Sequence, residues 1–282
     1  MNGNILVIGA TGKTGSRIVQ QLKQKGLNPR IGSRNAFPKF DWHNKNTWID
    51  TLKGIEKMYI TYYPDLAVPG AKEIIESLIH LAKELGVKKT VLLSGKGETE
   101  AEACEKIVIN SGLNYTIIRA SWFNQNWSES FFLESILSGE VALPMSDVPI
   151  PFVDAEDIAE VASTILLNDK YNSKIIELTG PELITFKDII KIISKVSNRK
   201  LNFYDISLEQ YVEGMKQQNV PNDMVWLIEY LFSTVLTNPE NQKITHGVDM
   251  VLGRPAKTFL AYAEACAKKD IWSNTEIQKQ TL

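Results

Sequence analysis

Short apolar runs alternate with longer segments of helical period through the first two thirds of the chain. The runs predict strands at residues 4–9, 28–33, 57–62, 89–94, 114–119, 149–154 and 173–179. Between them, apolar residues recur at helical spacing and predict helices at residues 13–25, 69–85, 99–111 and 155–167. Strands that alternate with helices in this way are typical of a parallel sheet covered by helices on both faces.

Two details refine this pattern. Glycines stand near the expected ends of three of the helices, at Gly26, Gly86 and Gly112, where the chain often turns through a left-handed conformation. Only seven residues separate Ser33 from Asp41, which is too few for a helix with a loop on each side. We therefore expect the second crossover of the sheet to be abbreviated.

The pattern becomes mostly helical from about residue 183. We predict an α/β fold in which residues 1–182 form a Rossmann-type doubly wound parallel sheet. Residues 183–282 are expected to form a smaller, mostly helical part that packs on it and carries substrate or partner contacts. One helix of this part should begin near Thr185, because Thr185 and Asp188 have the spacing of a capping box.

The composition limits the kinds of partner. Hydrophobic residues make up 44% and charged residues 23%, and the net charge is −2 without a basic run, so nucleic acid or a membrane surface has little electrostatic support. No secretory signal and no apolar run of about 18 residues is found. Cys104 and Cys266 form no CxxC pair, which fits a reducing compartment and buried apolar positions. We expect a cytoplasmic protein with a small-molecule partner.

The first predicted strand runs directly into GATGKTG, residues 9–15, and a predicted helix follows. Glycines at such spacing permit a tight turn and a close approach of the backbone to a pyrophosphate, which the helix N-terminus attracts. We predict a dinucleotide site, with an ordinary tight turn as the alternative. The expected contacts within the turn are Gly9, Thr11, Gly12, Lys13, Thr14 and Gly15.

The end of the second strand selects the cofactor. An acidic residue there would bind the ribose 2′-hydroxyl of NAD, whereas arginine accepts the 2′-phosphate of NADP. The sequence places Ser33 and Arg34 there without an adjacent acid, and Lys13 could add a second positive charge. NADP(H) is therefore favoured over NAD(H), and the alternative for Arg34 is a solvated surface side chain.

Further motifs carry a resemblance that covers almost the whole chain. They are GATGKTG, GSR, FDWHNKNTW, YYPDLAVPGA, LLSGKGE, TIIRASWFNQNW, DAEDIAEVA and LTGPELITF. Together they resemble the NmrA-like branch of the atypical short-chain dehydrogenases/reductases, and FDWxxxxTW is similar to the festuclavine and agroclavine dehydrogenase-like members and their bacterial relatives.

This resemblance implies a Rossmann domain with a small C-terminal substrate part. It also implies positions for further cofactor residues. Asp41 and Trp42 would lie beside the adenine, and Phe123 near the nicotinamide. Tyr62, Tyr63 and Pro64 would contact the cofactor after one strand, and Ser94 and Gly95 after the next.

The proton-transfer signature of most short-chain dehydrogenases is missing. None of the nine tyrosines has a lysine four residues further on, so no Tyr-x-x-x-Lys pair can exchange a proton with a carbonyl substrate. The segment expected to carry the pair holds Glu98, Glu100, Glu102 and Glu105 instead, and Lys106 is expected on a solvated helix face. Hydride transfer to an iminium, a quinone or a cationic dye carbon stays compatible with this sequence, and we expect an apolar, aromatic acceptor site.

Aromatic residues supply candidates for that site. Trp122 and Trp127 belong to a cluster after the strand predicted at 114–119, and Trp226 and Tyr230 share a face in an apolar C-terminal helix. A hydrophobic core or a subunit interface is the alternative for both groups. Asn124, Gln125 and Asn126 could orient a nicotinamide carboxamide or cap the following helix.

Two other polar groups are assigned structural roles. Asp154 and Asp157 have the spacing of an N-cap and the third helical position. The three histidines, at 43, 80 and 246, have no metal-ligand spacing, so no metal site is expected.

These observations favour an NADP(H)-dependent oxidoreductase that transfers a hydride to a flat, electron-poor organic acceptor. The alternative is a redox sensor that binds NADP(H) without turnover and acts through a protein partner. The missing Tyr-x-x-x-Lys pair favours the sensor, and the aromatic residues favour the enzyme.

Overall fold

The computed structural model describes residues 4–273, which form two compact units. Within these residues, the first unit comprises 4–120, 155–178 and 246–255, and the second comprises 121–154, 179–245 and 256–273. The chain therefore passes repeatedly between the units. From the sequence we expected two contiguous domains, 1–182 and 183–282, and this division stays a prediction. Each compact unit of the structure is built from three separate segments of the chain.

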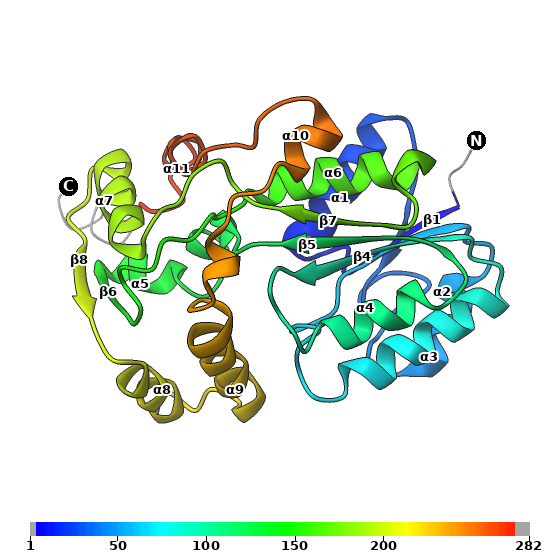
Figure 1. Cartoon of the computed structure of the whole chain (residues 1–282), viewed down its shortest axis with the longest axis horizontal. Coiled ribbons are helices and arrows are strands. Elements are labelled where there is room, and N and C mark those ends of the chain that lie inside the picture. Colours follow the sequence, from blue (N-terminus) through cyan, green and yellow to red (C-terminus); the bar gives the residue numbers. More distant parts are fainter. Residues whose placement is uncertain (1–3, 274–282) are drawn as a thin grey trace. The chain divides into compact units, whose positions relative to one another are not determined.

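A parallel sheet forms the centre of the first unit (Figure 1). Its strand order is β2-β1-β3-β4-β5-β7, and every neighbouring pair is parallel. The strands are β1 (Ile5–Ile8), β2 (Arg30–Gly32), β3 (Lys57–Ile60), β4 (Lys89–Gly95), β5 (Asn114–Ala120) and β7 (Lys174–Leu178). The strand order reverses between β1 and β3, which is where ligands of doubly wound sheets bind, beyond the carboxyl ends of the strands.

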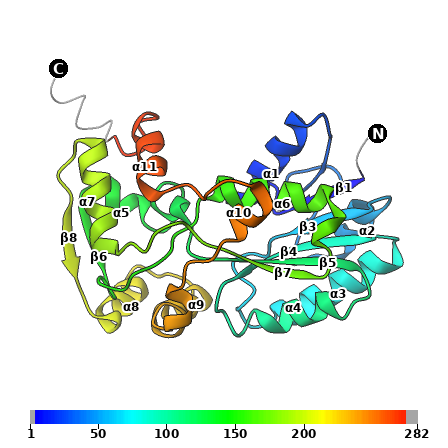
Figure 2. The same ribbon diagram turned by 45° about the horizontal axis from the view of Figure 1, so that its top comes forward.

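Helices cover both faces of this sheet, as Figures 1 and 2 show. On one face α1 packs against α6, with α10 beside α6, and on the other face α3 packs against α4. Their bounds are α1 Lys13–Gln24, α3 Ala71–Glu84, α4 Glu102–Ile109, α6 Ala155–Leu167 and α10 Gly247–Leu252. The predicted Rossmann-type architecture is confirmed, and no helix within residues 4–273 is long and apolar enough to cross a membrane.

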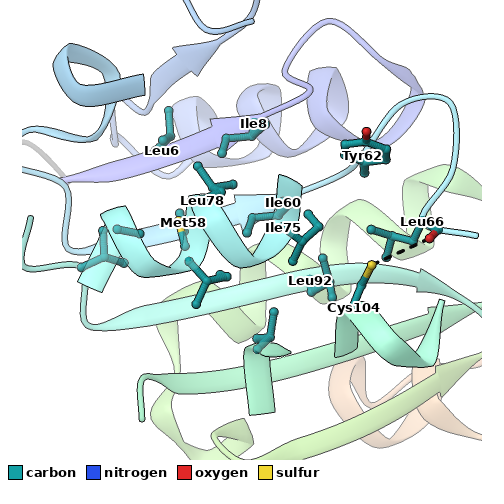
Figure 3. Close-up of a cluster of buried hydrophobic side chains, with 14 of the residues drawn as sticks. Leu6, Ile8, Met58, Ile60, Tyr62, Leu66, Ile75, Leu78, Leu92 and Cys104 are labelled. Atoms are coloured by element: carbon teal, nitrogen blue, oxygen red, sulfur yellow. Dashed lines mark hydrogen bonds between the residues drawn. The ribbon is translucent and has the colours of Figure 1, made fainter. Parts of the chain in front are cut away.

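The hydrophobic core between the sheet and α3 determines how these elements pack (Figure 3). Leu6, Met58 and Leu92 project from three neighbouring strands, and Ile75 and Leu78 project from α3 to meet them; all five are fully buried. Apolar positions on α3 recur at helical spacing, so this helix presents one apolar side to the core. Strand β1 is continuously apolar, and every residue of it is buried, because helices cover both faces of the sheet.

Local signals in the sequence placed the helix ends correctly. Gly26, Gly86 and Gly112 follow α1, α3 and α4 with φ of +76°, +87° and +81°, the left-handed conformation that glycine adopts without strain. The second crossover is abbreviated as expected, because α2 (Trp48–Leu52), preceded by a 3₁₀ turn (Lys45–Thr47), is its only α-helix.

The second unit is mostly helical. It contains α5 (Leu133–Ser138), α7 (Phe186–Ser197), α8 (Leu208–Gln217), α9 (Asn222–Tyr230) and α11 (Phe259–Ala267). A π-helical segment, Leu231–Val235, continues α9. Thr185 caps α7 by accepting a hydrogen bond from the Asp188 N–H, which confirms the capping interpretation.

One strand prediction, in this unit, was wrong. Residues 149–154 form only isolated bridges, one of them between Ile150 and Ile184, because Pro149 and Pro151 lack the N–H groups that a strand ladder requires. The unit instead holds a two-stranded parallel sheet, which the sequence pattern did not reveal. Its strands are β6 (Glu140–Leu143) and β8 (Asn202–Asp205).

Aromatic side chains form the core of the second unit. Trp127 is fully buried, and its ring lies 4.4 Å from Phe132 and 5.8 Å from Phe186 between centroids. Trp122 makes an edge-to-face contact with Phe232 at 5.3 Å. Pairs at such distances stabilise a core beyond the area they bury, so the core interpretation is favoured for Trp127.

Candidate dinucleotide-binding site

The turn after β1 has no room for side chains at two of its glycines. Gly9 adopts a φ of +75° and donates its N–H to the carbonyl of Gly32 at 3.0 Å, and a Cβ there would collide with Thr61. A Cβ on Gly15 would lie 2.7 Å from the carbonyl carbon of Gly9 and 2.9 Å from Cα of Ala10. The turn therefore packs directly against the first turn of α1.

The N-terminus of α1 has no side-chain cap. Gly12 is the N-cap residue, makes no side-chain hydrogen bond, and is exposed, and the first turn contains no acidic residue. The first amides of a helix and its dipole attract anions. This geometry fits the pyrophosphate of a dinucleotide, as in other glycine-rich strand–turn–helix units.

Thr14 has a structural contact in addition to its expected cofactor contact, which stays a prediction. Its side chain is buried, and its hydroxyl is hydrogen-bonded at 2.8 Å to the buried hydroxyl of Tyr59 on β3. Burial raises the pKa of Tyr59 above its ordinary value, so the phenol stays neutral and donates. This bond fixes the start of α1 against the sheet.

We predict that Tyr59→Phe lowers the free energy of unfolding by about 1–2 kcal/mol, because the buried Thr14 hydroxyl loses its partner. The measurement is urea denaturation monitored by circular dichroism. Tyr115→Phe is the matched control, since the Tyr115 hydroxyl makes no hydrogen bond within residues 4–273, and it should change stability by less than about 0.5 kcal/mol. Equal effects of the two substitutions would contradict a role for the Tyr59–Thr14 bond.

A groove of about 690 Å³ runs beside β2 in the first unit. It brings together two residues that the sequence predicted as cofactor contacts, Thr11 and Ser33. The other lining residues are Asn4, Asn28, Pro29, Arg30, Ile31, Asn35, Ala36, Phe37 and Ile55. The sequence analysis missed these residues, because only the fold places them around one groove.

Arg34 follows Ser33 on the loop that borders this groove. Its side chain is exposed and makes no hydrogen bond or ion pair with any residue between 4 and 273. Arg30 contrasts with it, since its guanidinium donates to the carbonyls of Thr51 and Lys53 at 2.9 and 2.7 Å. Arg34 is thus the arginine of this loop whose donors are available to an anion.

The structure brings Trp42 and Tyr62 together. Their ring centroids lie 4.8 Å apart, and Trp42 also packs edge-to-face on Phe40. The Asp41 carboxylate beside them accepts a hydrogen bond from the His43 N–H at 3.1 Å, which is the main cause of its lowered pKa. Asp41, Trp42 and Tyr62 thus lie together in the first unit, and their contacts with the cofactor stay predictions.

Other predicted site residues are spread over both units. In the first unit, Tyr63 is 70% exposed, and Ser94 is buried at the end of β4, next to Gly95. Phe123 belongs to the second unit, so its place beside the nicotinamide stays a prediction. Trp226 and Tyr230, also in the second unit, stack on each other with parallel rings at 5.4 Å, and their role toward an acceptor stays a prediction as well.

The two aspartates at the start of α6 are engaged with basic or amide groups. Asp154 accepts a hydrogen bond from Gln125 at 3.1 Å and lies 3.2 Å from Lys257 Nζ. Asp157 pairs with Arg254 at 2.8 Å. Their capping role stays a prediction. Across the part of the chain that the structure describes, no three His, Cys, Asp or Glu residues are arranged to hold a metal ion.

Comparison with known proteins gives the family. A model of the NmrA-like family matches residues 72–259, which is more than half of the chain, and the chain belongs to this family. It is 28% identical to prestalk A differentiation protein A of Dictyostelium discoideum, with 96% of this chain and 93% of that protein covered. It is 26% identical to agroclavine dehydrogenase of Claviceps fusiformis, with 95% and 98% covered.

Solved structures show the same fold. NADPH-dependent quinone oxidoreductase QOR2 of Escherichia coli, in complex with NADPH, superposes with a TM-score of 0.76 at 19% identity, covering 93% of this chain and 99% of that one. NmrA, a negative transcriptional regulator in complex with NAD, gives 0.72 at 16% identity, covering 98% of each. Family, fold and relatives support an NAD(P)-dependent oxidoreductase of the NmrA-like type.

Proposed function

We propose that the protein is an NADP(H)-dependent reductase that transfers a hydride to a flat, electron-poor organic acceptor. The preference for NADP(H) rests on Arg34. Its guanidinium is exposed just after β2, makes no hydrogen bond or ion pair with the described residues, and has no acidic residue beside it in the sequence. A carboxylate at that position would favour NAD, and arginine favours the 2′-phosphate.

In this proposal, different residues of the first unit bind different parts of the cofactor. Backbone amides at the start of α1 bind the pyrophosphate, and the close packing of Gly9 and Gly15 holds them in place. The N–H of Gly12 itself donates to the Gly9 carbonyl at 2.9 Å and stabilises the turn. Arg34 binds the 2′-phosphate, with the hydroxyls of Thr11 and Ser33 in the adjoining groove. The bound nicotinamide supplies the hydride.

The acceptor class rests on two supports. The chain lacks a Tyr-x-x-x-Lys pair, so an acceptor that takes a hydride readily is favoured over an unactivated carbonyl. The names of similar proteins point the same way, since they include agroclavine dehydrogenase, an NAD(P)H azoreductase and a quinone oxidoreductase. Exposed aromatic surface, such as Trp226 at 39% exposure, could bind a flat ring system.

We expect the purified protein to bind NADPH more tightly than NADH in a calorimetric titration and to oxidise NADPH when a suitable acceptor is added. The acceptor panel contains quinones, iminium compounds and triarylmethane dyes, and turnover is followed as loss of NADPH absorbance. A sample without acceptor is the control for background oxidation. Tight NADPH binding with no turnover on any acceptor would contradict the reductase proposal.

A redox sensor is the second candidate. Two relatives of this fold and family have names that denote regulation or development rather than catalysis, and the missing proton-transfer pair agrees with a protein that binds its cofactor without turnover. The sensor would be favoured by two results together. The purified protein would reduce none of the acceptors, and it would bind a protein partner in the presence of NADP⁺ but not of NADPH.

A further inference from the structure

Two carboxyl groups are paired at the carboxyl ends of neighbouring strands in the first unit. Asp65 lies on the loop after β3, and Glu98 lies on the turn after β4; their side chains are hydrogen-bonded to each other. Asp65 is held by the N–H of Ala67, which donates to its Oδ1 at 2.8 Å. Because two carboxylates cannot accept from each other, this bond requires a proton on one of them.

The structure makes space for the Glu98 carboxyl. That group lies directly over Gly95, in the position that any Cβ at residue 95 would occupy. Its Oε2 is buried and has no hydrogen-bond partner among the residues described, and the same holds for the hydroxyl of Ser94, which is 5% exposed. Glu98 as a whole is partly exposed. The strand end thus holds two polar atoms without a partner in this unit.

The surroundings keep the proton on this pair. Burial, followed by the negative charge of Asp65, raises the pKa of Glu98 well above its ordinary value, and burial also raises the pKa of Asp65. From α4, Glu105 adds a smaller effect in the same direction. Cys104 on α4 lies near Asp65, with its Sγ 3.8 Å from the carbonyl of Leu66 (Figure 3), and burial raises the pKa of this thiol to about 12. Both shifts favour the protonated form of the carboxyl groups, in agreement with the proton that their hydrogen bond requires.

We propose that Glu98 is the proton donor to acceptors that become anionic when they take up a hydride, and that Asp65 is its positioning residue. This inference rests on the proposed reductase function. For a quinone, the hydride supplies two electrons and one proton and leaves a negative charge on oxygen. The O–H bond of Glu98 breaks, a new O–H bond forms on that oxygen, and Glu98 regains a proton from water.

The position of the pair supports this role. The carboxyl edge of a parallel sheet is where ligands of this fold bind, and Ser94 and Gly95 at the same strand end are predicted cofactor contacts. The expected acceptor site, apolar and aromatic rather than rich in acids and bases, stays a prediction and leaves room for a single acid. The chain has no Tyr-x-x-x-Lys pair to donate a proton, and in this proposal the carboxylic acid of Glu98 takes that role.

Comparing the reduction of two acceptors distinguishes proton donation by Glu98 from its other roles. A neutral quinone needs a proton after hydride uptake, whereas a cationic triarylmethane dye becomes neutral and needs none. We expect Glu98→Gln to lower kcat/KM for the quinone by about 100-fold or more and to leave the dye within about threefold of wild type. Glu100→Gln, at an exposed position two residues further on, is the matched control and should leave both rates unchanged.

The pH profile tests the positioning role of Asp65. Quinone reduction by the wild type should fall as pH rises through the pKa of Glu98. Asp65→Asn removes the negative charge that raises this pKa, so the fall should move to lower pH. A profile that does not move would overturn the role of Asp65.

A readout without turnover tests the proton itself. The infrared band of a protonated carboxylic acid should be present in the wild type at neutral pH, absent in Glu98→Gln and retained in Glu100→Gln. Stability gives a second readout. Because the pKa of Glu98 is raised in the folded protein, its contribution to the free energy of unfolding is fully present below the ordinary glutamate pKa. This contribution is lost as pH rises through the raised pKa. The melting temperature of Glu98→Gln minus that of the wild type should therefore increase with pH.

The outcomes separate the two proposals. A wild type that binds NADPH but reduces neither acceptor overturns the reductase function, and the proton-donor role with it. A wild type that reduces both, with quinone reduction unchanged in Glu98→Gln, overturns the proton-donor role alone. Equal slowing of quinone and dye, or absence of the carboxylic acid band, also overturns it.

Discussion

Gly15→Ala is expected to weaken NADPH binding by about 100-fold, equivalent to ~2.8 kcal/mol, and to lower the free energy of unfolding by about 1–3 kcal/mol. The added methyl group would collide with the carbonyl of Gly9 and with Cα of Ala10. These contacts are with backbone atoms, which cannot rotate away as a side chain can. The turn or α1 must move, and the amides that face the pyrophosphate move with it.

The protein offers a matched control for this substitution. Gly214 is also a helical glycine, in α8, and a Cβ there has no neighbour within 4 Å. We expect Gly214→Ala to raise stability by about 0.5–1 kcal/mol through its better helix propensity and to leave NADPH affinity unchanged. Calorimetric titration and thermal melting measure both effects. If Gly15→Ala binds NADPH as tightly as wild type, the glycine turn does not hold the pyrophosphate.

Arg34→Ala is expected to weaken NADPH by about 10- to 100-fold and to leave NADH within about twofold. A charge-assisted hydrogen bond contributes about 1.5–3 kcal/mol, and only NADPH carries the phosphate that makes it. The affinity for NADPH should also fall with rising ionic strength in the wild type and depend less on salt in the variant, since the contact is exposed to solvent.

Arg30→Ala provides the comparison for Arg34. Arg30 lines the same groove, but its guanidinium is bound to backbone carbonyls, so its loss should lower stability without changing the ratio of NADPH to NADH affinity. Equal weakening of both cofactors by Arg34→Ala would remove Arg34 from the phosphate site and, with it, the reason to favour NADP(H).

The local features of this protein were determined by the sequence itself. Alternation of apolar runs with helical segments predicted the parallel sheet, and the glycines after α1, α3 and α4 marked helix ends, because a positive φ is a property of one residue and its neighbours. The strand predicted at 149–154 was wrong although its residues are apolar. Two prolines remove donors that the pattern of hydrophobicity does not report.

The tertiary structure alone decided which distant residues meet. The groove beside β2 joins residues on either side of α1 with Ile55, and the buried hydroxyl of Tyr59 on β3 meets Thr14 at the start of α1. Asp65 and Glu98 stand in motifs that the sequence analysis had already quoted, yet nothing in either motif indicates a shared proton. Their pairing depends on the adjacency of β3 and β4 and on the space above Gly95, and both are properties of the folded chain. Apolar periodicity reports the side of an element that faces a core, whereas the environment of an ionisable group is set by whatever else packs around it.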